Sequence, residues 1–242
     1  MFKDKNGKIQ IFTDGGNLDS IIQLSKDDLI DGITTNPSLM RKSQVTNYMT
    51  FARSAVKASR GKSLSLEVFA DNHEDMKRQA LKLHSLGESV YVKIPIINSN
   101  GLSSIDVIKF LLDKGIAINI TALLSSKQIK ECIDLLANNS DNKVYISIFA
   151  GRIADTGRDP IPIFKKFKKI LEKRNLKNVK ILWASTREVF NVYQAIKAGC
   201  DIITLNPQII SKLKLKDYDL EKLSLETVQM FKKDADLSKY EI

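Results

Sequence analysis

The 242-residue sequence has few of the residues on which metal, redox and histidine-based sites depend. It contains two cysteines, Cys132 and Cys200, and two histidines, His73 and His84. Their spacing matches no CxxC or mixed Cys/His ligand pattern, so we expect two buried free thiols. We expect neither a zinc site nor a histidine-based catalytic triad, and the sequence predicts no metal.

Long apolar runs are also absent. No stretch approaches the roughly 18 to 20 apolar residues that span a bilayer. The first residues, MFKDKNGKIQIF, lack the apolar segment of a secretory signal. We therefore expect a cytoplasmic protein with no membrane partner.

Positive charge is abundant, with a formal net charge of +10, but its pattern does not suit nucleic acid. Only eight of the 38 basic residues are arginine. The densest basic run, residues 164–177, has apolar residues at helical spacing, which places its lysines on the opposite, solvated face. We expect no nucleic-acid partner and an attraction for anionic, phosphorylated small molecules.

Strand-like and helical segments alternate along the chain without a linker. The strand-like segments are residues 10–14, 32–36, 65–70, 90–95, 117–123, 144–151, 181–185 and 201–206. Helical spacing marks residues 18–30, 44–60, 72–86, 102–114, 126–138, 160–173 and 187–198, and the tail adds helices near 207–214 and 219–234. Such alternation is typical of a (β/α)8 barrel, or TIM barrel.

We predict one α/β domain, a (β/α)8 barrel over residues 1–242 with a helical extension from about 207 to 242. A doubly wound sheet is the alternative, but no GxGxxG turn follows any strand. Extensions of this kind often carry oligomer contacts or an active-site cover, and we expect a homo-oligomer.

Four consecutive strands have one apolar alternate set of residues and one polar set. In a barrel, alternate side chains of a strand point to the interior and to the helices. Five polar side chains are thus predicted in the interior: Glu67, Lys93, Asn119, Thr121 and Ser147. Asp14 and Asn36 come at the carboxyl ends of their strands, where barrel active sites lie.

This polar set suits an amine nucleophile that is served by carboxylates. A lysine in a poorly hydrated interior binds its proton less tightly and becomes nucleophilic toward a carbonyl. Asp14 and Glu67 could supply the proton transfers that Lys93 would need, and the hydroxyl of Thr121 could hold a water.

A second group follows the sixth and seventh strands. Arg152, Ser185 and Arg187 combine two guanidinium groups with a hydroxyl, which is a plausible phosphate clamp at the top of a barrel. The alternative is surface ion pairing with acidic neighbours: Asp155 or Asp159 for Arg152, and Glu188 for Arg187.

Five segments, GITTNPSL, VYVKIP, NITALLS, SIFAGRI and ASTR, resemble the transaldolase family of class I aldolases in order and separation. The resemblance extends from Asp14 to about Pro207. It implies a (β/α)8 barrel, a Schiff base on Lys93, and no cofactor. The implied reaction, of the pentose phosphate pathway, moves a dihydroxyacetone unit from sedoheptulose 7-phosphate or fructose 6-phosphate to an aldose phosphate.

The resemblance also implies roles for single residues. Asp14 and Glu67 match the acid/base pair and Thr121 the residue on the catalytic water. The remaining matched positions are Asn36, Asn119 and Ser147 for the dihydroxyacetone unit and sugar hydroxyls, and Arg152, Ser185 and Arg187 for the phosphate.

Related fructose 6-phosphate aldolases carry glutamine at the position of Glu67 and tyrosine at that of Phe149, so both positions favour the transferase. The alternatives are such an aldolase, a Schiff-base aldolase for another sugar phosphate, or a non-catalytic barrel that binds sugar phosphates. Departures from the family pattern occur at Gly15, Gly16, Ile148 and Glu188, around the expected substrate pocket.

Overall fold

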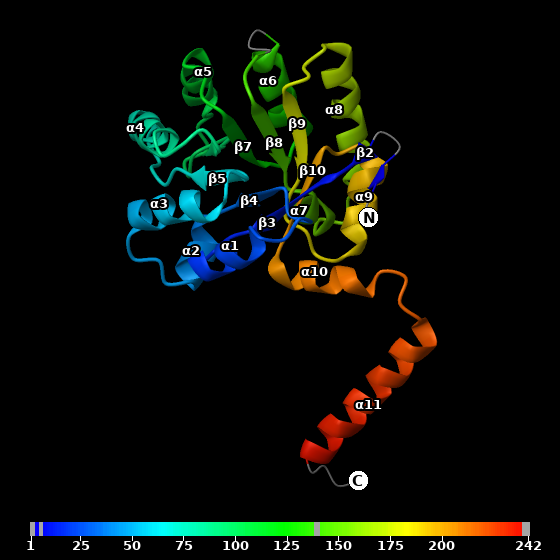
Figure 1. The fold of residues 1–242 in the computed structure, drawn as a ribbon. Coiled ribbons are helices and arrows are strands. Elements are labelled where there is room, and N and C mark those ends of the chain that lie inside the picture. Colours follow the sequence, from blue (N-terminus) through cyan, green and yellow to red (C-terminus); the bar gives the residue numbers. More distant parts are fainter. Residues whose placement is uncertain (1–2, 5–6, 138–140, 239–242) are drawn as a thin grey trace.

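Eight parallel strands form a closed barrel in the computed structural model, which describes residues 3–4, 7–137 and 141–238 (Figure 1). The strand order is β10-β3-β4-β5-β6-β7-β8-β9. The strands are β3 (Gln10–Asp14), β4 (Gly32–Thr34), β5 (Ser63–Glu67), β6 (Val90–Pro95), β7 (Ile118–Leu123), β8 (Val144–Ile148), β9 (Val179–Trp183) and β10 (Ile202–Leu205). The predicted (β/α)8 barrel is confirmed, and the doubly wound sheet is wrong.

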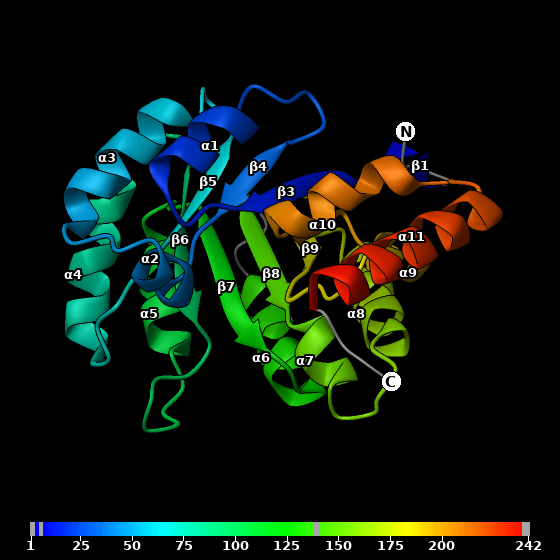
Figure 2. The ribbon, with the colours of Figure 1, turned by 90° about the horizontal axis from the view of Figure 1, so that it is seen from below.

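Helices follow the strands and surround the barrel (Figures 1 and 2). They are α1 (Leu18–Leu24), α3 (Tyr48–Ala58), α4 (His73–His84), α5 (Ile105–Asp113), α6 (Ser126–Leu136), α8 (Ile161–Lys173) and α9 (Phe190–Ala198), with the short helices α2 (Pro37–Lys42) and α7 (Ala150–Ala154) after β4 and β8. Many begin at an asparagine or serine whose side chain accepts from a backbone N–H three residues on, as Asn72 does at α4 and Ser125 at α6.

Some predicted boundaries are wrong. The strand predicted over residues 144–151 ends at Ile148, because the next residues turn into α7. The helix predicted over residues 44–60 starts only at Tyr48. The preceding α2, which the spacing did not predict, begins with Pro37 at its first turn and ends before Gln44, whose φ is +54°.

The barrel interior divides into an aromatic lower part and a polar upper part. Phe12, Tyr145 and Tyr91 fill the lower part: the Phe12 and Tyr145 rings lie edge to face at 5.6 Å, and those of Tyr91 and Tyr145 stack at 4.0 Å. Gly32 makes room for this filling, because a Cβ there would lie 2.7 Å from the Phe12 ring. The filled lower part confines any cavity to the carboxyl ends of the strands.

The apolar alternate set of each strand packs outward against the helices and forms the main core. Cys132 and Cys200 belong to this core as buried free thiols, as predicted. The sequence alternation therefore assigned the two faces of the strands correctly.

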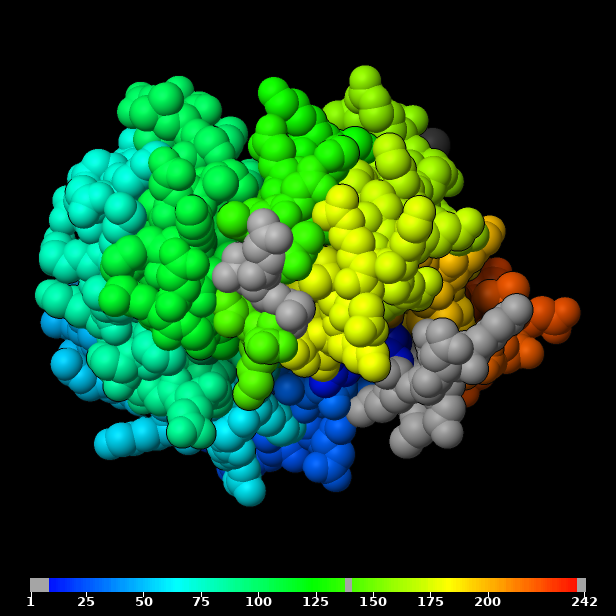
Figure 3. All heavy atoms as spheres, turned by 90° about the horizontal axis from the view of Figure 1, so that it is seen from above, coloured from blue at the N-terminus to red at the C-terminus, as the bar shows by residue number. Residues whose placement is uncertain are grey.

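The chain also has a two-stranded antiparallel element, β1 (Lys3–Asp4) with β2 (Gly7–Lys8), before the barrel. The barrel is followed by α10 (Pro207–Lys212), a 3₁₀ turn (Leu213–Leu215) and α11 (Leu220–Ser238), which extends away from the barrel (Figure 1). Figure 3 shows the face opposite to that of Figure 2, where middle segments of the chain cover the barrel and the orange tail lies at the edge. None of the described helices is both long and apolar enough to span a membrane.

Candidate active site

A cavity of about 370 Å³ opens at the carboxyl ends of the barrel strands. All of the predicted site residues line it except Asn119 and Arg187; those that do are Asp14, Asn36, Glu67, Lys93, Thr121, Ser147, Phe149, Arg152 and Ser185. The residues come from strands on every side of the barrel, so folding brings together positions more than 170 residues apart in sequence.

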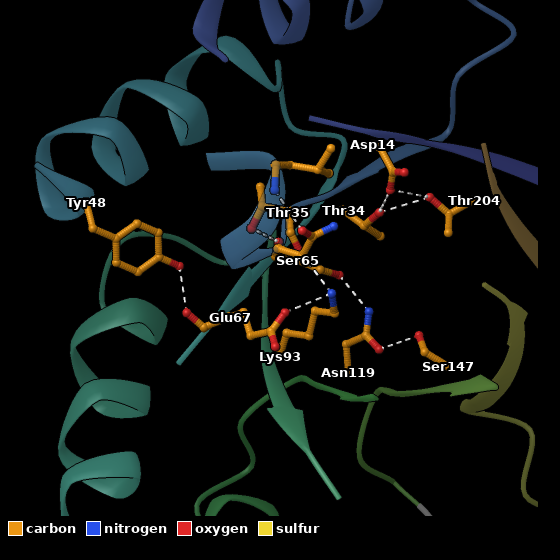
Figure 4. Close-up of polar contacts among 12 residues, drawn as sticks. Asp14, Thr34, Thr35, Tyr48, Ser65, Glu67, Lys93, Asn119, Ser147 and Thr204 are labelled. Atoms are coloured by element: carbon orange, nitrogen blue, oxygen red, sulfur yellow. Dashed lines mark hydrogen bonds and ion pairs between the residues drawn. The ribbon is translucent and has the colours of Figure 1, made fainter. Parts of the chain in front are cut away.

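Lys93 is at the centre of this constellation and is 7% exposed. Its Nζ lies 2.9 Å from Oε2 of Glu67 and donates a 2.8 Å hydrogen bond to the carbonyl oxygen of Thr35 (Figure 4). Glu67, Lys93 and Asn119 are register partners on β5, β6 and β7, and this places the three side chains at one level of the interior. A buried amine is thus held beside a carboxylate in an accessible cavity.

Asp14, at the end of β3, is held by two threonine hydroxyls. Thr34 Oγ1 donates to Asp14 Oδ1 at 3.0 Å, Thr204 Oγ1 donates to the same oxygen at 3.5 Å, and the two hydroxyls are 2.9 Å apart (Figure 4). Burial raises the pKa of Asp14 above its usual range, against the opposing effects of Thr34, the Lys93 charge and Thr204. A carboxyl with a raised pKa holds a proton more readily than a free carboxyl, which suits a group that takes up and returns a proton.

Asn119 lies beneath the cavity surface and is fully buried. Its Nδ2 donates to Ser65 Oγ at 2.9 Å, and its Oδ1 accepts from Ser147 Oγ at 2.6 Å (Figure 4). Ser147 does line the cavity. In this structure Asn119 therefore reaches the cavity through Ser147 and not by its own surface.

Thr121 faces the cavity from β7 with a hydroxyl that is buried and has no hydrogen-bond partner among the described residues. The next residue, Ala122, has a φ of +60°, where β7 and β8 change register. A buried hydroxyl without a partner costs roughly 1–3 kcal/mol. This orphan hydroxyl is therefore suited to a hydrogen bond with a molecule in the cavity.

Asn36 has two tasks. Its Oδ1 accepts from the backbone N–H of Leu39 at 2.9 Å and so caps α2. Asn36 also lines the cavity, and the cap leaves its amide Nδ2 available to donate there.

Arg152 and Ser185 line the cavity on the side of β8 and β9, whereas Arg187 does not. Arg187 forms a two-pronged ion pair with Asp155, with Nε–Oδ1 3.3 Å and Nη2–Oδ2 2.6 Å. This pairing lowers the pKa of Asp155 and raises that of Arg187. The predicted alternative, an ion pair between Arg187 and an acidic residue, is therefore present, but the partner is Asp155 and not Glu188.

Arg152 instead lies over the Phe149 ring, 5.9 Å from its centroid, and forms no ion pair within the described part of the chain. Its helix can approach the β9 loop because residue 151 is glycine: a Cβ on Gly151 would lie 1.7 Å from the Ser185 carbonyl oxygen. Ser185 has a φ of +64°, an uncommon value for serine. The close approach at Gly151 thus brings the backbone of α7, which carries Arg152, next to Ser185.

Sequence reasoning missed several residues of the site. Thr34 and Thr204 share the inward parity of their strands, and that signal was present but not used. Lys42 lines the cavity from the last turn of α2, a helix that was not predicted. Tyr48 donates from its hydroxyl to the Glu67 carbonyl oxygen at 2.8 Å, and nothing in the α3 pattern distinguishes it from a core residue.

Comparisons with known proteins identify the family of this chain. The sequence pattern of the family described as transaldolase/fructose-6-phosphate aldolase matches residues 11–242. The chain belongs to this family. It is 35% identical over 218 residues to a probable transaldolase of Nitrosopumilus maritimus, covering 90% of this chain and 92% of the relative. It is 32% identical over 205 residues to a probable transaldolase of Carboxydothermus hydrogenoformans, covering 85% and 90% of the two chains.

Membership of the transaldolase family and the names of these relatives indicate that the chain is an enzyme, a transferase. Among solved structures, dihydrodipicolinate synthase from Thermotoga maritima aligns with a TM-score of 0.61 at 10% identity, over 94% of this chain and 81% of that one. At this identity the likeness shows a shared barrel fold alone.

The structure explains one departure from the transaldolase pattern. A Cβ on Gly15 would lie 2.7 Å from Ile33 Cγ2 and 2.9 Å from Ile21 Cγ1, so the segment after Asp14 packs where a side chain does not fit. The glycine draws α1 close to β4 directly behind Asp14.

Proposed function

We propose that this chain is a transaldolase that carries a dihydroxyacetone unit on Lys93 between sugar phosphates. The observation that carries the proposal is the buried Lys93 amine, 2.9 Å from the Glu67 carboxylate, in a cavity that also presents Arg152. The family resemblance implies the donor ketoses sedoheptulose 7-phosphate and fructose 6-phosphate. Each has a carbonyl group near one end of the carbon chain, for Lys93, and a phosphate at the other end, for Arg152.

The first half of the reaction forms the covalent intermediate. The Lys93 amine, after it has passed a proton to Glu67, adds to the ketose C2 carbonyl and forms the N–C bond. The carbinolamine oxygen takes up a proton and leaves as water, which the Thr121 hydroxyl can hold. The product is an iminium ion, which withdraws electrons from the adjacent carbon chain.

The second half breaks and remakes a carbon–carbon bond. Asp14 takes the proton of the C4 hydroxyl, the C3–C4 bond breaks, and its electron pair moves toward the iminium to give an enamine. The aldose phosphate leaves. The enamine then attacks the aldehyde carbon of the acceptor, Asp14 returns its proton to the new hydroxyl, and water releases the ketose. The raised pKa of Asp14 suits this two-way transfer.

Neutral polar groups orient the dihydroxyacetone unit in this proposal. Ser147 and the amide of Asn36 face the cavity and would contact its hydroxyls. Asn119 fixes the Ser147 hydroxyl from below. Arg152 and Ser185 would bind the phosphate, and Arg187, now paired with Asp155, would have to rotate to join them.

A homo-oligomer in the cytoplasm completes the proposal. The oligomer is supported by the exposure of α11. No residue of this helix is buried, and Leu220, Phe231 and Leu237 are each more than 60% exposed. Contact with another copy would remove these apolar side chains from water. Light scattering of the full chain gives the subunit number, and a monomer at all concentrations would oppose this part. Pathway membership remains a prediction.

The aldolase alternative differs in its demand for an acceptor. Fructose 6-phosphate is supplied with and without erythrose 4-phosphate, and sedoheptulose 7-phosphate and glyceraldehyde 3-phosphate are measured. A transaldolase forms both products only when the acceptor is present. Release of glyceraldehyde 3-phosphate and free dihydroxyacetone at an equal rate in the absence of the acceptor would identify an aldolase. The absence of turnover with any ketose phosphate would favour the third alternative, a non-catalytic barrel that binds sugar phosphates.

A further inference from the structure

The cavity contains two cations besides Lys93: Lys42 and Arg152. Lys93 is paired with Glu67, but Lys42 and Arg152 form no ion pair among the described residues, although both line the cavity. Both residues are exposed, and exposed cations at the rim of a concave site raise the local concentration of anions. One of the two, Arg152, serves the single phosphate of the proposed substrates, and Lys42 is left without a role.

Lys42 is part of the cavity wall and not a side chain that merely lies near it. It occupies the last turn of α2, three and four residues after Leu39 and Ser38, which also line the cavity. Residues at this spacing share one helix face. The cap that Asn36 places on α2 fixes the direction of this face toward the site.

The two cations are on opposite sides of the mouth. α2 follows β4 and α7 follows β8, and these strands are separated by β5, β6 and β7 in the closed order of eight. Lys93 on β6 is midway between them. A ketose attached to Lys93 through C2 would have one end toward Lys42 and the other toward Arg152 if it lay across the mouth.

We infer that Lys42 is a second anion-binding contact, and that the cavity accepts ketose bisphosphates, with one phosphate at Arg152 and the other at Lys42. A compact ammonium on a flexible stem is a common phosphate ligand. The inference rests on the proposed function only for the orientation of the ketose. The calorimetric test measures binding directly, so the inference about Lys42 can succeed or fail whether or not the protein catalyses the proposed reaction.

Titration calorimetry with fructose 6-phosphate and fructose 1,6-bisphosphate tests the inference on three proteins: wild type, Lys42→Met and Lys57→Met. Lys57 is a matched control, because it is an exposed lysine in the last turn of α3 that does not line the cavity. One charge-assisted contact is worth about tenfold in affinity. We expect wild type and Lys57→Met to bind the bisphosphate about tenfold more tightly than the monophosphate. We expect Lys42→Met to lose this preference, with a much smaller loss of affinity for the monophosphate than for the bisphosphate.

Three results would overturn the inference: equal affinity of wild type for both ligands, a preference that survives in Lys42→Met, or an equal loss for both ligands in that variant. The last would place Lys42 on the same phosphate as Arg152. Lys42→Arg, which keeps the charge, should retain the preference, and circular dichroism checks that each variant is folded.

Discussion

The Nζ atom of Lys93 lies 2.9 Å from Oε2 of Glu67, and the two residues are register partners on adjacent strands of the barrel. Both side chains are about nine-tenths buried, at 8% and 12% exposed. The pair therefore brings an amine and a proton acceptor into direct contact where little water competes. Schiff-base chemistry requires this proximity, since the amine reacts only without its proton.

Lys93→Met should abolish turnover and also destabilise the fold, because it leaves the Glu67 carboxylate buried without a cation. We expect a loss of about 3–5 kcal/mol in the free energy of unfolding. The double variant Lys93→Met/Glu67→Gln should recover most of it, and urea unfolding of both measures the difference. Equal free energies of unfolding for the single and double variants would show that the unpaired Glu67 carboxylate does not destabilise the fold.

Asp14→Asn should remove activity but raise stability at neutral pH. The folded state raises the pKa of Asp14, so the unfolded chain ionises first as the pH rises above about 3.9, and wild type loses stability until the folded pKa is passed. The amide of the variant does not ionise, so the variant does not lose stability in this way as the pH rises. The melting temperature of Asp14→Asn should exceed that of wild type by about 2–4 °C at pH 7. The two should converge below pH 3.9, and a gap that is independent of pH would contradict the burial effect.

Gly151→Ala should weaken the binding of phosphorylated substrates. The added Cβ would lie 1.7 Å from the Ser185 carbonyl oxygen, so α7 and the β9 loop must separate and carry Arg152 away from Ser185. We expect a KM for sugar phosphates about tenfold higher, with a smaller change in kcat. Gly157→Ala is the control, because its Cβ meets nothing within 4 Å and only its φ of +75° is unfavourable. A similar KM in both variants would refute the packing argument.

Phe149→Tyr should increase cleavage of fructose 6-phosphate in the absence of an acceptor, since the added hydroxyl enters the cavity and resembles the aldolase pattern. The ratio of free dihydroxyacetone to transferred product measures the change. Phe69→Tyr alters another aromatic residue that does not line this cavity, and it should keep the wild-type ratio. An unchanged ratio in Phe149→Tyr would remove this residue from the control of specificity.

The repeated succession of strand and helix predicted the barrel. The period-two alternation within the strands predicted the inward position of Lys93, because such patterns are local and strong. It did not show which inward groups line the cavity. Asn119 has the same parity as Lys93, yet Ser147 covers it, and that relation depends on how β7 and β8 pack.

Arg187 shows a second limit. Its partner Asp155 is 32 residues away in sequence and becomes a neighbour only when α7 folds back against the β9 loop. The prediction of a strand through residue 151 concealed this helix. Side chains whose role depends on such short, irregular connections carry little local signal.

The most direct test of the central claim is to trap the covalent intermediate. Wild type and Lys93→Met are incubated with fructose 6-phosphate, reduced with borohydride, digested and analysed by mass spectrometry. Lysine chemistry at the proposed position predicts a reduced dihydroxyacetone adduct on the peptide that contains Lys93, and no adduct in the variant. An adduct on another lysine, or none with any ketose phosphate, would contradict it.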